Sequence, residues 1–174
     1  MEVEGAVAAQ AKEMERDYRV AWDTGAGAQV TFSDRGQPFV APLLSGGSLD
    51  FGTLLGTKPV VLTFWASWCA PCLLEAPHLV ALHGRYADQG VAFVAVSIDE
   101  EDDYETLRQV VKDLALPYPV ALDSRGATLG TYATGASIPL TFVLDRSGAI
   151  VYRHQNFEAG DEVAIEKAVQ AALQ

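Results

Sequence analysis

Two long apolar runs mark the middle of the chain. Residues 59–67 read PVVLTFWAS and residues 91–99 read VAFVAVSID, and both are rich in β-branched and aromatic side chains. Continuous apolar runs of this length are typical of strands that are buried on both faces of a sheet. Between them, Leu79 and Leu82 belong to an apolar series at helical spacing, which predicts a helix over residues 69–86. We therefore expect a strand, a helix and a second strand in this part of the chain.

The pattern continues with two more helices and three more strands. A helix is expected over about residues 102–114, and the last helix begins at Asp161 with two acidic residues, which suit the positive end of a helix dipole. Two short apolar runs around Gly46 and Gly47 predict a hairpin before the first strand. This order of elements predicts an α/β fold with a central mixed sheet that is covered by helices on both faces. The three further strands are predicted from the runs PYPVALDS, IPLTFVLD and AIVYRHQ, at residues 117–124, 138–145 and 149–155.

The pattern is weaker over residues 1–36, which we interpret as an N-terminal extension ahead of a single domain at residues 37–174. An apolar series at four-residue spacing from Met14 to Trp22 favours a short amphipathic helix. The apolar residues on either side of residues 24–27 favour a hairpin instead. Both interpretations stay open from the sequence.

Composition and charge exclude two classes of function. Of the 174 residues, 49% are hydrophobic, and the formal net charge is −11. Such an acidic balance argues against binding nucleic acid. No apolar run approaches the roughly 18 residues that span a membrane. The first 17 residues lack the basic start and the apolar stretch of a secretory signal, so no signal or anchor is recognised in this sequence; an extracytoplasmic protein without its signal would look the same.

Cys69 and Cys72 are the only cysteines in the chain. Because a buried strand is predicted to end just before Cys69, we expect this thiol in the first turn of a helix at the carboxyl edge of the sheet, where α/β folds hold their sites. The helix N-terminus favours a thiolate and can lower a cysteine pKa from about 8.5 to about 7 or below. Pro71 fits the first helical turn. Cys72, one turn further on, can reach Cys69 to form a disulfide.

Three non-redox roles for the cysteine pair fit the sequence less well. Buried cysteines can act as small apolar side chains, but the WCAPC sequence at a strand–helix junction argues against this. A zinc site needs two more ligands, and His78, His83 and His154 lack ligand spacing, so we expect no metal. A static disulfide across so short a loop would stabilise the fold little. A redox-active pair is therefore expected.

The segment FWASWCAPC is followed by LLEAP and, about seventy residues later, by IPLTFVLD. This set of motifs resembles the thioredoxin superfamily, and in detail its TlpA/ResA-type branch. The resemblance covers roughly residues 38–174 and implies a thioredoxin-like domain there. It implies that Cys69 attacks a substrate disulfide, that Cys72 resolves the mixed disulfide, and that Pro139 is a cis-proline beside the thiols.

The same resemblance suggests roles for further residues. Trp68 and Pro71 match the rim of the site, and the backbone of Ile138 matches the segment that pairs with a substrate strand. Thioredoxin has a buried aspartate six residues before its first cysteine, but Thr63 stands here and cannot titrate in the useful range. Glu75 matches a glutamate of the TlpA/ResA-type proteins and is our candidate for the proton acceptor. The alternative is that Glu75 is a surface acid near the start of the helix.

An acidic run occupies residues 99–105, where six of seven side chains are carboxylic acids. We interpret it as the solvated start of a helix. The alternative is that it selects basic partners, because it follows a parallel strand and should lie at the same edge of the sheet as Cys69.

Together these features predict a monomeric, cofactor-free thiol–disulfide oxidoreductase that reduces protein disulfides outside the cytoplasm. Ala70 and Pro71, between the thiols, carry no charge, which favours a reductant over a strong oxidant. The expected partners are protein disulfide substrates and a membrane-bound or soluble thiol electron donor, with cytochrome maturation implied only at the level of the family. Two alternatives stay open: a redoxin-type thiol peroxidase, and a non-catalytic copper-binding module, for which no histidine stands near Pro139.

Overall fold

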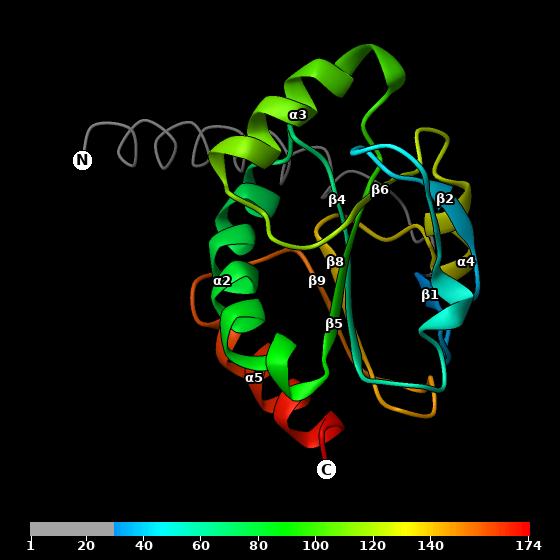
Figure 1. The fold of residues 1–174 in the computed structure, drawn as a ribbon, viewed down its shortest axis with the longest axis vertical. Coiled ribbons are helices and arrows are strands. Elements are labelled where there is room, and N and C mark those ends of the chain that lie inside the picture. The colour runs from blue at the N-terminus through cyan, green and yellow to red at the C-terminus, as the bar shows by residue number, and fades with distance from the viewer. Residues whose placement is uncertain (1–29) are drawn as a thin grey trace.

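The computed structural model describes residues 30–174 and contains a mixed sheet of five strands (Figure 1). Strands β4, β5 and β6 are parallel, whereas β8 pairs antiparallel with both β4 and β9. The predicted α/β class with a central mixed sheet is confirmed. In the order in which they lie across the sheet, the strands are β6 (Val120–Leu122), β5 (Ala92–Ser97), β4 (Val60–Trp65), β8 (Leu140–Leu144) and β9 (Ile150–Gln155).

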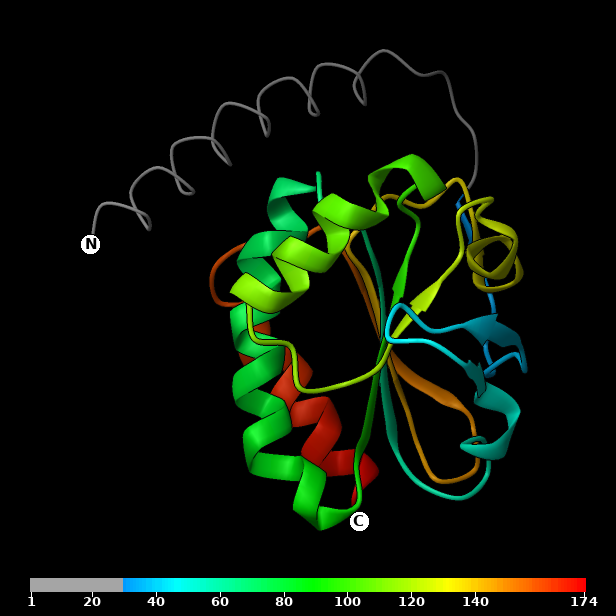
Figure 2. The same cartoon turned by 45° about the horizontal axis from the view of Figure 1, so that its top comes forward.

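Helices and short strands cover the two faces of this sheet, as Figures 1 and 2 show. One face carries α2 (Ala70–Tyr86), α3 (Tyr104–Asp113) and α5 (Asp161–Ala172). The chain moves in one direction across the sheet from β4 to β5 to β6, so two right-handed crossovers place α2 and α3 on the same side. The opposite side carries the short elements β1 (Thr31–Phe32), β2 (Val40–Pro42), β3 (Ser48–Asp50), the 3-10 turn Phe51–Thr53, α4 (Ala127–Tyr132) and β7 (Ala133–Thr134).

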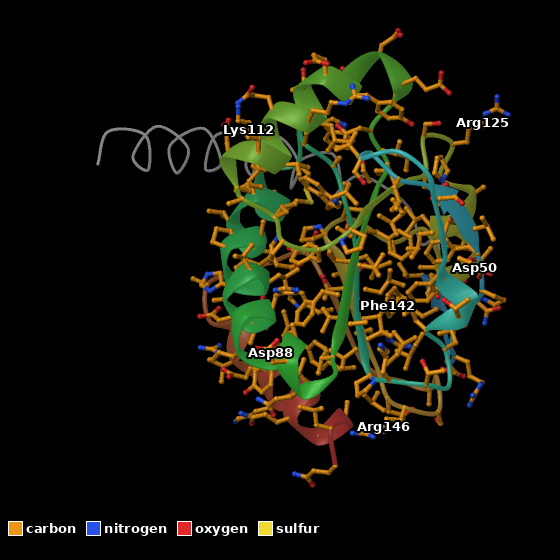
Figure 3. The ribbon with its side chains drawn as sticks, viewed as in Figure 1. Asp50, Asp88, Lys112, Arg125, Phe142 and Arg146 are labelled. Atoms are coloured by element: carbon orange, nitrogen blue, oxygen red, sulfur yellow. A yellow bond between two sulfur atoms is a disulfide. The ribbon has the colours of Figure 1, made fainter. Side chains whose placement is uncertain are left out.

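Strand β8 is buried on both faces and so connects the two layers of the core. Phe142 lies in the packed interior in Figure 3, and its ring centroid is 5.4 Å from that of Tyr132 and 6.3 Å from that of Phe64. The Tyr132 hydroxyl donates to the carbonyl of Gln37 and accepts from its N–H, both at 2.8 Å. Thr141, the neighbouring residue on β8, faces the opposite layer, where it contacts α2. Both faces of this strand are therefore part of the core.

Most predicted elements are present, with differences at the short ones. The predicted hairpin around Gly46 and Gly47 is formed by β2 and β3, and both glycines have positive φ, at +100° and +75°. The helix predicted over residues 102–114 begins as the 3-10 turn Glu101–Asp103 and becomes α-helical at Tyr104. Elements α4, β1 and β7 were not predicted, because two to six residues give too little periodicity to recognise.

The predictions for the N-terminal residues stay predictions. The helix or hairpin predicted between Met14 and residue 32 begins outside the described residues. The boundary between an extension and a domain at residue 36 also stays a prediction. Within the described part, the pairing of β1 with β7 and the hydrogen bond from Gly36 N–H to the Gly148 carbonyl, at 2.8 Å, join residues 31–36 to the rest of the fold.

Candidate active site

The two cysteines form a disulfide at the N-terminus of α2. Cys69 is the N-cap residue, with extended φ and ψ, and its Sγ accepts a hydrogen bond from the Cys72 backbone N–H at 3.3 Å. Pro71 stands in the first helical turn, where its missing N–H costs no helical bond. The first thiol therefore lies at the positive end of the helix dipole with a backbone donor directed at it, which favours its thiolate form.

The surroundings of the thiols are mostly apolar, with Glu75 and Thr63 as polar neighbours of the cavity that Cys72 lines, and part of them is open to solvent. The Cys69 and Cys72 residues are 5% and 3% exposed, so exposure does not distinguish them. Trp68, next to Cys69, is 49% exposed. Ile138 and Pro139 are buried, and the peptide bond between them is cis. Pro139 lines a small cavity together with Cys72, so this part of the predicted rim lies beside the second thiol.

Glu75 lies on α2, three residues after Cys72, and its side chain is buried against the sheet at 1% exposure. Its Oε1 accepts a hydrogen bond from Thr141 Oγ1 at 2.6 Å and another from Thr63 Oγ1 at 3.2 Å. The two threonine oxygens are also 2.8 Å apart, but each hydroxyl has one proton, so the two hydroxyls donate only two of these three hydrogen bonds at a time. The alternative that Glu75 is a surface acid is wrong.

Burial gives Glu75 unusual acid–base behaviour. Loss of hydration on burial is the largest cause and raises the pKa of Glu75, the hydrogen bonds from Thr141 and Thr63 lower it in part, and the nearby charge of Asp161 raises it slightly, so that the pKa moves from 4.5 to about 7. Oε2 has no hydrogen-bond partner among residues 30–174. Glu75 and Cys72 both line a small cavity of about 10 Å³, close to the least volume that holds a water molecule. A carboxyl group that exchanges its proton near neutral pH therefore lies beside the cavity of the second thiol.

Sequence reasoning missed Thr141, the strongest partner of Glu75. The signal was a hydroxyl residue inside the apolar run IPLTFVLD, where a buried polar group requires a partner. Its partner could not be found from the sequence, because it depends on β8 pairing antiparallel with β4 so that Thr63 and Thr141 stand opposite each other. Thr63 does not titrate, as expected, but it has a role as a donor to Glu75.

The acidic run divides into two parts with different surroundings. Residues 100–103 and 105, called the acidic segment below, are exposed at the start of the helix, consistent with a solvated helix start. Asp99 is 0% exposed, and the interpretation that it belongs to a solvated run is wrong. Its carboxylate accepts hydrogen bonds from Ser67, two residues before Cys69, and from Ser97. The charge pattern did not reveal that Asp99 is buried, because five of the six residues that follow it are exposed acids.

The histidines do not join the thiols. The ring of His78 lies 5.3 Å from that of Phe157, and the ring of His83 lies 5.2 Å from that of Phe93. His154 Nε2 is 3.4 Å from an oxygen of Asp161. In the part of the chain that the structure describes, no three His, Cys, Asp or Glu side chains lie close enough together to hold a metal ion.

Three features define a thioredoxin-like dithiol protein. They are a mixed five-stranded sheet, a C-x-x-C pair at the start of the helix that follows the central strand, and a neighbouring cis-proline. The model of the AhpC/TSA protein family matches residues 32–153 of this chain. The chain belongs to this family, and the recognition of a thioredoxin-like protein is confirmed.

Named relatives agree with this assignment. The chain is 35% identical over 113 residues to the thiol-disulfide oxidoreductase ResA of Bacillus thuringiensis, an alignment that covers 65% of this chain and 63% of that protein. It is 34% identical over 116 residues to ResA of Halalkalibacterium halodurans, with 67% and 64% covered. These matches therefore span slightly less than two thirds of the length of the relatives.

Solved structures share the fold over most of the chain. A protein of Chlorobium tepidum described as a thiol:disulfide interchange protein DsbE superposes with a TM-score of 0.72 at 28% identity, covering 84% of this chain and all of that one. A secreted Mycobacterium tuberculosis disulfide oxidoreductase, described as homologous to DsbE of E. coli, superposes with a TM-score of 0.67 at 27% identity, with 76% and 95% covered.

Proposed function

We propose that this protein is a thiol–disulfide oxidoreductase that reduces disulfides in other proteins outside the cytoplasm. The observation that carries the proposal is the Cys69–Cys72 pair at the N-terminus of α2, with a backbone N–H directed at the first sulfur. A helix N-terminus stabilises the thiolate, which is the nucleophile in disulfide exchange. The names of the ResA and DsbE relatives support the same chemistry.

The reaction has two exchange steps. The Cys69 thiolate attacks one sulfur of the substrate disulfide, the substrate S–S bond breaks, and the other substrate sulfur leaves as a thiolate that takes up a proton. The Cys72 thiolate then attacks Cys69 Sγ, the mixed disulfide breaks, and the second substrate sulfur leaves in the same way. Two electrons pass to the substrate, and the protein ends in the disulfide form. A thiol donor returns it to the dithiol.

Glu75 is proposed as the group that accepts the proton of Cys72 before the second step. A general base works best when its pKa is near the working pH, and burial brings the pKa of Glu75 to about 7. Its free oxygen and the shared cavity with Cys72 give the proton a short route. Thr63 and Thr141 hold the other oxygen, so the carboxyl group keeps one orientation.

Substrate binding is proposed at the apolar rim. Trp68 offers an exposed aromatic surface next to the nucleophile, and Pro71 lies in the first turn of the helix that carries it. Ile138 and Pro139 are proposed to present backbone groups to an extended substrate segment, which would add to the site as a strand adds to an edge.

The compartment and the partners belong to the same proposal. One structural relative is described as secreted, which supports an extracytoplasmic location for this protein. Among residues 30–174, no helix is long and apolar enough to cross a membrane. The electron donor is a membrane-bound or soluble thiol protein, and the substrates are protein disulfides.

The reduction potential of the pair tests whether the protein is a reductant. We expect a value nearer the roughly −270 mV of thioredoxin than the roughly −120 mV of a strong oxidant, because no cation stands between the thiols. A value above about −180 mV would contradict the reductant proposal. A peroxide-consumption assay separates the peroxidase alternative: we expect slow, non-catalytic loss of hydrogen peroxide, and rapid turnover would favour the peroxidase.

A further inference from the structure

Asp99 is a fully buried carboxylate two residues after the end of β5, outside the set of residues that the proposed chemistry uses. Its oxygens accept hydrogen bonds from the Ser67 backbone N–H, at 2.9 Å and 3.2 Å, and from the Ser67 hydroxyl. The Ser97 hydroxyl donates a further bond at 2.7 Å and in turn accepts the Asp99 backbone N–H at 3.0 Å. Both donors of Ser67, in the segment after β4, are therefore directed at one side chain in the segment after β5.

Ser67 belongs to the turn that ends at Cys69. In this turn the Cys69 N–H donates to the Ala66 carbonyl at 3.2 Å, so residues 66–69 form one hydrogen-bonded unit. Two residues of chain span at most about 7 Å, which places the carboxylate of Asp99 within about 10 Å of the Cys69 backbone. A negative charge at this range disfavours a thiolate. Asp99 is thus close enough to affect both the orientation and the charge of the nucleophile.

A carboxylate is buried at a large free-energy cost unless donors surround it. Among residues 30–174, the donors to Asp99 come from two residues, and one of them is the residue that fixes the active-site turn. Removing the carboxylate would leave the N–H and O–H of Ser67 buried without partners, and the turn would have to move to satisfy them. The position of Cys69 relative to Cys72 depends on that turn.

We propose that Asp99 is a positioning residue for thiol–disulfide exchange: by anchoring Ser67, it holds the turn that presents Cys69 to Cys72. The inference rests on the proposed function. Its measurable consequence is the effective concentration of one thiol at the other, which determines how readily the dithiol closes to the disulfide. The negative charge acts in the same direction, because it disfavours the thiolate of the reduced form and so favours the disulfide.

The test is the redox equilibrium of the purified protein with glutathione, followed for wild type and variants. We expect Asp99→Ala to lower the equilibrium constant for closing the disulfide about tenfold, which corresponds to a rise of about 30 mV in reduction potential. Asp99→Asn keeps an oxygen for the Ser67 N–H, and Ser67→Ala keeps the charge, so each should lower the constant about threefold. These milder variants carry the test if Asp99→Ala does not fold.

Asp123 provides a matched control at the same edge of the sheet. It is a buried carboxylate that follows β6, and its oxygens accept the N–H groups of Thr128 and Leu129 at 3.1 Å and 2.9 Å, away from the active-site turn. We expect Asp123→Ala to lower the melting temperature while leaving the glutathione equilibrium within twofold of wild type.

Two results have separate meanings. If the Asp99 and Ser67 variants match the Asp123 control, with lower melting temperatures and an unchanged glutathione equilibrium, then Asp99 only stabilises the fold and the inference is wrong. If wild type fails to reduce insulin disulfides, the proposed function is wrong. That outcome leaves the glutathione equilibrium measurable, so the role of Asp99 in positioning the pair is still decided.

Discussion

Replacing Glu75 with glutamine should change how the stability of the protein depends on pH. Glu75 has a pKa of about 7 in the folded protein, against 4.5 without burial. Between these two values the unfolded chain releases the proton while the folded protein keeps it, so the free energy of unfolding falls as pH rises. Above pH 7 both states are ionised, and the loss levels off.

The magnitude follows from the two pKa values. A difference of roughly 2.5 units, at about 1.4 kcal/mol for each unit, gives a loss of about 3 kcal/mol between pH 4 and pH 8. Glutamine has nearly the same shape and no proton to lose. Relative to wild type, the Glu75→Gln protein should therefore become more stable by about 3 kcal/mol as pH rises through this window.

The assay is denaturant unfolding of the oxidised proteins at intervals between pH 4 and pH 8. The difference between variant and wild type at pH 4, where both side chains are neutral, is the baseline. Glu105→Gln is a suitable control because Glu105 is exposed on α3, and its difference from wild type should stay nearly constant. A Glu75→Gln difference that stays within about 0.5 kcal/mol of its baseline would refute the reasoning, because about 3 kcal/mol is expected.

Three further outcomes follow from the same site. In rapid kinetics, Glu75→Gln should slow the release of the mixed disulfide at neutral pH with little effect on the first attack. It should also remove a pH dependence of the release rate that is centred near pH 7. An unchanged release rate would contradict the proton-acceptor role of Glu75. Thr141→Val removes a donor to the Glu75 carboxylate, so it should raise the pKa of Glu75 and cost about 1.5–3 kcal/mol of stability at pH 8 but less at pH 4, measured by denaturant unfolding. If the acidic segment selects partners, basic disulfide substrates should be reduced faster than acidic ones at ~10 mM salt but not at ~1 M. Neutralising Glu100, Glu101, Asp102 and Asp103 should remove this preference and leave the turnover of a small neutral disulfide unchanged.

Apolar patterning is enough to predict the sheet and the position of the cysteine pair. The runs at residues 59–67 and 91–99 are long, and a strand that is buried on both faces needs an apolar residue at nearly every position. The first of these runs ends just before Cys69, which places the thiol at a helix N-terminus. These predictions depend on local pattern, and they are confirmed by β4, β5 and α2.

Buried polar contacts could not be predicted in the same way. Thr141 reaches Glu75 from a strand 66 residues further along the chain, and Asp99 reaches Ser67 across 32 residues. Each contact depends on how neighbouring strands are aligned, and a single polar residue within an apolar run does not specify that register. Residue type alone also misled the prediction for Asp99. An acidic side chain is expected to be exposed to solvent, whereas Asp99 is buried and hydrogen-bonded in the interior.

Trapping experiments with single-cysteine variants test the central claim, that Cys69 begins exchange and Cys72 completes it. Exposure does not separate the two thiols, so the assignment depends on the N-cap position of Cys69 and the backbone donor at its sulfur. The Cys72→Ala protein should accumulate mixed disulfides with protein substrates, because nothing resolves them, and the Cys69→Ala protein should accumulate none. Accumulation with Cys69→Ala, or with neither variant, would contradict the account.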